Sequence, residues 1–154
     1  MNKLKTAYGE LNLKRIILMI AVLSLSACAG TEGDSMEKPN KVMYHAIDKN
    51  DTARLNIQLG EKAFDGQLEI SYNSLYKDSG DVNGIIKGDT LKGTYYFQHY
   101  GIPKWERIPI SILRKDSKLI MGVGDMEIYM NMTFFKKRVP IDYQHVKFIF
   151  EKAK

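Results

Sequence analysis

The stretch Gly84-Ile85-Ile86-Lys87-Gly88-Asp89-Thr90-Leu91-Lys92-Gly93-Thr94-Tyr95-Tyr96-Phe97 decides the fold, because it joins two short β-rich runs through a two-residue turn. Gly88 can adopt the positive φ that the first position of a type II′ turn requires. After the turn, Leu91, Tyr95 and Phe97 fall on one face of a strand and polar residues fall on the other. The stretch therefore predicts a β-hairpin whose second strand is half buried.

The chain beyond residue 41 repeats this pattern, with turn signals at intervals of about 8–12 residues. The predicted strands lie near Ala53–Leu59, Phe64–Tyr72, Val82–Lys87, Thr90–Gln98, Trp105–Leu113, Lys118–Val123, Met126–Phe135 and His145–Glu151. Further turns are predicted at Gly60-Glu61-Lys62, Asp78-Ser79-Gly80-Asp81 and Lys115-Asp116-Ser117. No segment has the apolar spacing of a helix. We therefore predict an all-β fold, an antiparallel meander of about eight strands that is barrel-like, either lipocalin-like or a flattened barrel.

Pro109 interrupts the predicted strand that carries Ile108, Ile110 and Ile112. Because proline has no N–H to donate to a ladder, it marks an edge, a bulge or the point where a barrel fails to close. We expect side chains to fill the interior of such a barrel. The alternative is a small-molecule pocket at an open end.

The first residues have the features of a bacterial lipoprotein signal peptide. A basic start is followed by the apolar run Ile16–Leu25, which is too short for a transmembrane helix. The run ends in the lipobox Leu25-Ser26-Ala27-Cys28. We expect cleavage after residue 27, lipidation of Cys28, a flexible tether over residues 28–41 and a β-domain over residues 42–154. Ala29, which follows the lipidated cysteine, favours an anchor in the outer membrane. The anchored domain would lie on either the periplasmic or the surface face of that membrane.

Cleavage also changes the charge and the chemistry of the chain. The full sequence has 23 basic and 18 acidic residues, whereas residues 28–154 have 19 and 17. These charges are interspersed, which argues against a nucleic-acid partner. Cys28 is the only cysteine, and lipidation would consume its thiol. The mature chain could then form no disulfide, thiol nucleophile or thiolate metal site.

A family resemblance rests on the motif G-x-I-x-G-D-T-L-x-x-x-Y-x-F at residues 84–97 and on Phe64-Asp65-Gly66-Gln67-Leu68. With these motifs the chain resembles a group of small envelope lipoproteins of Bacteroidota, over most of residues 43–125. The resemblance implies a β-meander and an envelope location, and it implies no activity. Members of the group commonly carry a cysteine at each end of the domain. Here those regions are Met43-Tyr44-His45 and Phe148–Lys154, so that disulfide is absent.

Catalytic patterns are not evident, and we predict no catalytic residue and no cofactor. The serines lack a Gly-x-Ser-x-Gly context. Asp125 and Glu127 could share a strand face as an acid–base pair, but alternation with Met126 and Ile128 indicates a solvated face. The sequence therefore argues against an enzyme.

The methionines and histidines are the candidate metal ligands of this sequence. Thioethers of Met126, Met130 and Met132 could converge on Cu(I), although we expect them to fill the core instead. His45, His99 and His145 lack the spacing of a zinc site. No metal site is predicted.

The candidate binding surface surrounds the loop 99–104. It consists of Tyr95, Phe97, His99, Tyr100, Trp105 and Arg107, where rings would supply contact area and His99 or Arg107 a polar handle. In the competing interpretation, Tyr95 and Phe97 are core and Trp105 caps it.

The sequence thus favours a membrane-anchored, non-catalytic binding or interaction lipoprotein. Its partner would be an envelope protein or a small apolar ligand, and its contact with the membrane would be the N-terminal lipid. A structural envelope component and a copper sensor are the alternatives.

Overall fold

The structure is a computed structural model that describes residues 40–154. Its strands are β1 (Val42–Asp48), β2 (Asp51–Leu59), β3 (Ala63–Tyr72), β4 (Tyr76–Lys87), β5 (Thr90–His99), β6 (Trp105–Lys115), β7 (Lys118–Met121), β8 (Met126–Tyr129), β9 (Met132–Phe135) and β10 (Ile149–Lys152). The predicted signal peptide, Cys28 and the tether up to residue 39 lie outside the described residues.

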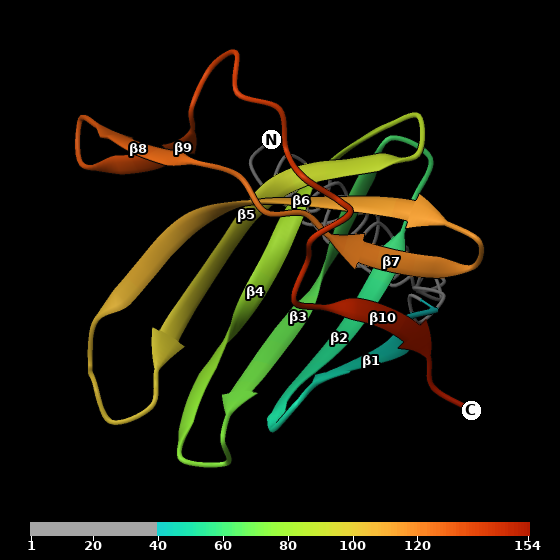
Figure 1. Ribbon diagram of the computed structural model, residues 1–154, viewed down its shortest axis with the longest axis horizontal. Coiled ribbons are helices and arrows are strands. Elements are labelled where there is room, and N and C mark those ends of the chain that lie inside the picture. The colour runs from blue at the N-terminus through green and yellow to red at the C-terminus, as the bar shows by residue number, and fades with distance from the viewer. Residues whose placement is uncertain (1–39) are drawn as a thin grey trace, which may run out of the picture. The chain divides into compact units, whose positions relative to one another are not determined.

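Eight of these strands form a closed antiparallel barrel in the order β1-β10-β7-β6-β5-β4-β3-β2. The prediction of an all-β, barrel-like meander is therefore confirmed. Figure 1 shows β8 and β9 as a hairpin outside the barrel ladder, and β9 packs beside β6. The first predicted strand corresponds to β2. The prediction missed β1, which precedes β2 and pairs with it along the whole length of β1, from Val42↔Ile57 to Asp48↔Asp51.

The barrel closes through short ladders at one end. β10 pairs with β1 at Tyr44↔Lys152 and His45↔Glu151, and with β7 at Ile149↔Ile120 and Phe150↔Leu119. β7 in turn pairs with β6 only from Ile112 to Lys115. Within residues 40–154, the first half of β6 therefore has a ladder with β5 alone. Pro109 lies in this half, paired with Thr94, so it marks an open edge of the wall as its chemistry predicts.

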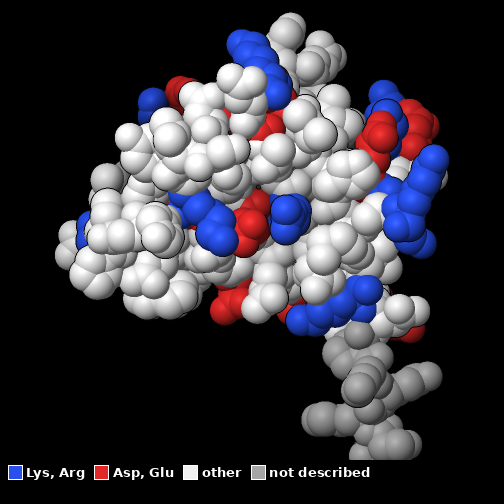
Figure 2. Space-filling model, turned by 90° about the horizontal axis from the view of Figure 1, so that it is seen from below, with Lys and Arg blue, Asp and Glu red and all other residues white. Residues whose placement is uncertain are grey.

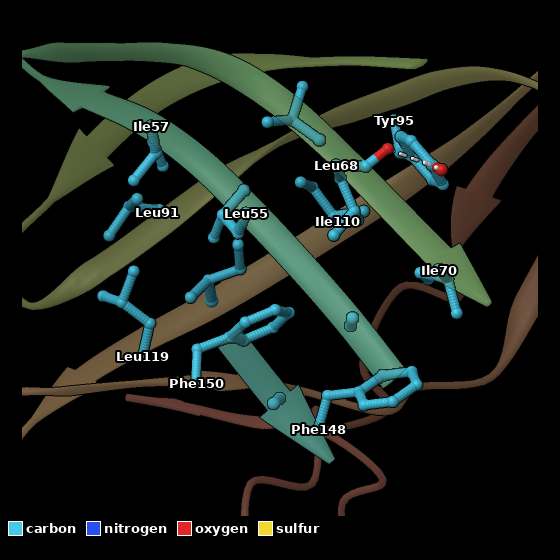
Figure 3. Packing of buried hydrophobic residues seen from close by; sticks show 14 of the residues in the cluster. Leu55, Ile57, Leu68, Ile70, Leu91, Tyr95, Ile110, Leu119, Phe148 and Phe150 are labelled. Atoms are coloured by element: carbon cyan, nitrogen blue, oxygen red, sulfur yellow. Dashed lines mark hydrogen bonds between the residues drawn. The ribbon is translucent and has the colours of Figure 1, made fainter. Parts of the chain in front are cut away.

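The core occupies the barrel interior (Figure 3). The buried apolar side chains are Ala46, Ala53, Leu55, Ile57, Phe64, Leu68, Ile70, Val82, Leu91, Tyr95, Phe97, Ile110, Ile112, Leu119, Phe148 and Phe150. They alternate with outward-facing residues along β2, β3 and β5, as period-two strands require. The core residues and barrel strands described here all lie within the compact unit Pro39–Lys154, and a compact unit with its own hydrophobic core is the kind that can fold alone.

Two facing glycines allow β4 and β5 to approach closely. Gly84 and Gly93 are register partners, and a Cβ added to Gly93 would lie 1.9 Å from the carbonyl oxygen of Asn83. No larger residue fits without separating the strands. These glycines therefore permit the curvature that closes the sheet.

Three of the predicted turns are present. Gly88 has φ +57° between the partners Lys87 and Thr90, as the first position of the predicted turn requires. The turns at Gly60-Glu61-Lys62 and Lys115-Asp116-Ser117 are also found.

The predicted turn at Asp78-Ser79-Gly80-Asp81 is wrong. These residues belong to β4, and the chain reverses earlier, at Asn73 and Ser74, which have φ +50° and +58°. The turn-like composition has other causes. Asp78 is a buried polar residue, and a Cβ on Gly80 would lie 2.0 Å from the carbonyl oxygen of Tyr96.

The single strand predicted over Met126–Phe135 is also wrong, because the chain reverses at Met130 and Asn131 to form β8 and β9. The register pairs Met126 with Phe135 and Tyr129 with Met132, which places Met126 and Met132 on opposite faces. All three methionines are exposed, so the prediction that they fill the core is wrong. Strand parity misled the assignment because it does not continue through a turn.

Candidate binding site

The predicted aromatic surface is divided by the barrel wall. Tyr95 and Phe97 point inward, and only 1% and 7% of their surfaces are exposed. Their rings stack with centroids 4.5 Å apart, and the Tyr95 hydroxyl donates to the Leu68 carbonyl oxygen over 3.1 Å (Figure 3). Both residues are therefore core, and a ligand could reach them only from inside the barrel.

Trp105 and Arg107 lie on the outer face of the same wall. The register pairs Tyr96 with Arg107, whose guanidinium carbon lies 5.2 Å from the Tyr96 ring centroid. Trp105 stacks on the same ring, with centroids 4.8 Å apart. Trp105 therefore does not cap the core. Tyr96 was missing from the predicted surface, although its even position in the strand placed it outward with Lys92 and Thr94.

A hollow of about 460 Å³ with a mixed polar and apolar lining borders Trp105 on the outer face. Outward side chains of β2 to β4 line it, among them Arg54, Asn56, Gln67 and Asp81. This hollow is open and mixed in charge. Figure 2 likewise shows acidic and basic side chains interspersed on the face that it presents.

The structure places His99 at the end of β5, where it turns to the inner side of the wall, whereas Trp105, the partner of Gln98, faces outward. Its Nδ1 contacts a carboxylate oxygen of Asp78, and the Tyr72 hydroxyl donates to the other oxygen over 3.1 Å. The Tyr76 ring stacks on His99, with centroids 6.0 Å apart. Asp78 is only 8% exposed, and a buried carboxylate requires such donors. Burial, together with the Asp78 charge, raises the pKa of Tyr72, so its hydroxyl remains a donor at neutral pH.

A cavity of about 210 Å³ opens beside this group, and we call it the barrel-mouth cavity. Its lining residues are Ile70, Tyr72, Asp78, Tyr95, Phe97, Ile108, Met121, Gly122, Val123, Lys147 and Phe148. Core side chains form its inner wall, whereas Tyr72, Asp78 and Lys147 supply its polar atoms. Core side chains thus fill the interior except at this end, where the structure has the cavity that the sequence left as an alternative.

Lys147 contributes to the wall of the barrel-mouth cavity. Its Nζ lies 2.5 Å from an Asp51 carboxylate oxygen and 4.8 Å from the Tyr72 ring centroid. Asp51 also accepts the backbone N–H of Asn73 over 2.8 Å. The hydrogen bonds from Lys147 and Asn73 lower the pKa of Asp51. These contacts link the β1–β2 turn, the β3–β4 turn and the segment before β10.

The remaining candidates from the sequence stay apart. Within residues 40–154, no three His, Cys, Asp or Glu side chains are grouped to hold a metal ion. His145 lies 2.9 Å from Asp142 in an exposed pair. Asp125 and Glu127 are exposed, and Lys136 pairs with Asp125 over 3.3 Å. Tyr100 is 74% exposed on the β5–β6 loop.

Sequence reasoning missed most of this site, namely Asp78, Tyr72 and Lys147. The three residues come from separate elements and share no spacing motif. Asp78 offered the clearest signal. Once residues 78–81 are assigned to the same strand as Val82, the alternation of faces places Asp78 on the inward side with Val82.

Comparisons with known proteins supply no family for this chain: no family model, curated protein or solved structure matches it. In the described part of the chain, no helix has the length and apolarity to cross a bilayer.

Proposed function

We propose that this chain is a lipid-anchored protein of the bacterial outer membrane whose barrel is a non-catalytic binding module for a small apolar ligand. The lipobox at residues 25–28 supports the anchor and the location. The barrel-mouth cavity carries the binding role, because a concave apolar site with a few polar groups is the usual form of a ligand site.

The walls of the barrel-mouth cavity suggest the chemistry of the ligand. Tyr95, Phe97 and Phe148 offer an apolar surface, while Asp78 and Lys147, each already paired within the protein, place one charge of each sign at the side. A ligand with an apolar body and one polar group would match both features. At about 210 Å³ the cavity suits a small molecule or the end of a longer one, since drug-sized ligands occupy about 300–1,000 Å³.

The hydrogen bonds support a non-catalytic role. The Asp78 carboxylate is already bonded to Tyr72 and His99, which satisfies a buried charge and joins β3, β4 and β5. Within residues 40–154, no serine, threonine or lysine side chain hydrogen-bonds to His99 as an activated nucleophile would.

A filling substitution tests the ligand site directly. Ile108→Phe adds volume at the wall of the barrel-mouth cavity, whereas Ile85→Phe makes the same change on the exposed face of β4. The probe is the fluorescent dye 1-anilinonaphthalene-8-sulfonate, added to the domain of residues 40–154. We expect saturable binding that weakens about tenfold in Ile108→Phe, equivalent to about 1.4 kcal/mol, and stays unchanged in Ile85→Phe.

Thermal unfolding of both variants controls for damage to the fold. Dye binding that Ile108→Phe leaves intact, or that both variants reduce equally, would overturn the assignment of the ligand to the barrel-mouth cavity. The alternatives of a structural envelope component or a copper sensor then become the better proposals.

A further inference from the structure

The β8–β9 hairpin exposes more apolar surface than its position in the fold explains. Ile128, Tyr129 and Met130 are 78%, 62% and 73% exposed, and Met132 and Phe134 are also exposed. Soluble domains rarely expose such groups together unless they contact something. The end of β9 packs beside β6, but the tip from Ile128 to Met132 has only its own two strands, which gain little stability in water by themselves.

The turn of the hairpin shows that its sequence does not favour stability. Met130 and Asn131 have φ +48° and +60°, the left-handed values of a type I′ turn. Asparagine and glycine tolerate the first of these positions, whereas methionine is disfavoured there. A large, exposed apolar side chain at a strained position costs stability, and such positions are concentrated at functional sites.

We propose that the β8–β9 hairpin inserts its tip into the interfacial region of a lipid bilayer. Apolar side chains occur on both faces of the hairpin, with Met126 and Ile128 on one and Tyr129, Met132 and Phe134 on the other. A protein groove usually contacts one face of a hairpin, whereas lipid surrounds both. The two-sided apolar character therefore favours a bilayer as the occupant.

The charges next to the hairpin fit an anionic surface. Lys136, Lys137 and Arg138 follow β9 directly and are exposed. Lys136 is paired with Asp125 over 3.3 Å, which leaves Lys137 and Arg138 to contact headgroups. Apolar and aromatic side chains next to basic ones are typical of segments that lie in the membrane interface.

The backbone limits the depth of insertion. A two-stranded hairpin has unpaired N–H and C=O groups along both outer edges, and these groups are too costly to place in hydrocarbon. The hairpin therefore reaches only the headgroup and upper acyl region, about 5–10 Å deep. This contact would orient the domain on the membrane, and it does not depend on a ligand in the barrel-mouth cavity.

Vesicle co-sedimentation of the domain of residues 40–154 tests the proposal, because this domain lacks Cys28 and any bound lipid anchor. Vesicles contain phosphatidylethanolamine with phosphatidylglycerol, or phosphatidylcholine alone. We expect binding to the anionic vesicles and about a tenfold weaker association for Ile128→Asp, since a carboxylate would enter the interface. Leu75→Asp is the matched control, because Leu75 is 70% exposed on a different turn.

A second variant separates contact from folding. Met130→Asn replaces the apolar tip with a residue that suits positive φ, so it should keep or raise the thermal stability and still weaken vesicle binding. Lys137→Gln with Arg138→Gln should reduce the preference for anionic vesicles.

Two outcomes would overturn the proposal. The first is equal vesicle binding by the wild type, Ile128→Asp and Met130→Asn. The second is no vesicle binding together with a dimer, seen by sedimentation velocity, that Ile128→Asp dissociates. That result would assign the hairpin to a second copy of the chain.

Discussion

Alanine substitutions at Tyr95 and Trp105 should have very different effects on stability, because the barrel wall separates the two rings. Tyr95 is 1% exposed and lies in the core, whereas Trp105 is 48% exposed on the outer face. Removal of a buried aromatic side chain typically costs about 3–5 kcal/mol. Trp105→Ala should cost about 1 kcal/mol, the value of a stacked aromatic pair with Tyr96.

Urea unfolding followed by far-UV circular dichroism measures both costs. Tryptophan fluorescence cannot serve, because Trp105 is the only tryptophan. With a slope of about 2 kcal/mol per molar urea, Tyr95→Ala should lower the midpoint by about 2 M and Trp105→Ala by about 0.5 M. Tyr95→Phe provides an intermediate control, since it removes only the hydrogen bond to the Leu68 carbonyl, worth about 1–2 kcal/mol.

Equal midpoints for Tyr95→Ala and Trp105→Ala would contradict the orientation of β5 and β6. A large cost at Trp105 would mean that this ring caps the core after all. A negligible loss of stability in Tyr95→Ala would mean that Tyr95 is not part of the inner wall of the barrel-mouth cavity. The ligand proposal would then lose its basis.

Four further predictions concern the anchor, the backbone and pH. A fatty-acid analogue should label the full-length protein in cells and not Cys28→Ala, and equal labelling would contradict the lipobox assignment. Gly88→Val should cost about 1–3 kcal/mol through strain at φ +57°, measured as a lower urea midpoint. Gly93→Ala should cost about 3 kcal/mol or more, because its Cβ would meet a backbone oxygen at 1.9 Å; an unchanged midpoint would refute that close approach. Folding lowers the pKa of Asp51 and raises that of Tyr72, so stability should fall as pH drops through the folded pKa of Asp51 and again as pH rises above 10.0. Asp51→Asn and Tyr72→Phe should each make one limb of the profile less steep. The rest of the acid limb comes from Asp142 and Glu151, and the rest of the alkaline limb from Tyr95.

The strand pattern was predictable wherever a strand has one buried and one exposed face. The turn predicted at Gly88, a residue that accepts positive φ, gave the correct β4–β5 register. The alternation from Leu91 to Phe97 identified the face that lies in the core. β1 escaped prediction because its burial pattern contains one buried residue, Ala46. A strand with so little buried surface has almost no hydrophobic periodicity to detect.

The candidate site was predictable only in part, because it depends on register between distant strands. Aromatic residues near the loop 99–104 were recognised, but the sequence could not show that Trp105 meets Tyr96 across the ladder. Asp78 and Tyr72 meet His99 only after three strands are aligned. Such contacts depend on tertiary structure and leave no local spacing to find.

The segment between β7 and β10, residues 122–148, contains most of the structural features that lie outside the barrel. Its last part, residues 136–148, joins β9 to β10 without a helix or strand of its own, and connections of about this length are uncommon in compact domains. One part of the segment is anchored to the wall: the Tyr143 hydroxyl lies 2.5 Å from Ser111 Oγ, and Val123 bridges to Asp142. Another part supplies Lys147 and Phe148 to the barrel-mouth cavity. The β8–β9 hairpin between them exposes apolar side chains and a strained methionine, which the stability of the barrel does not require. A role in contact with other molecules accounts for that composition better than packing does.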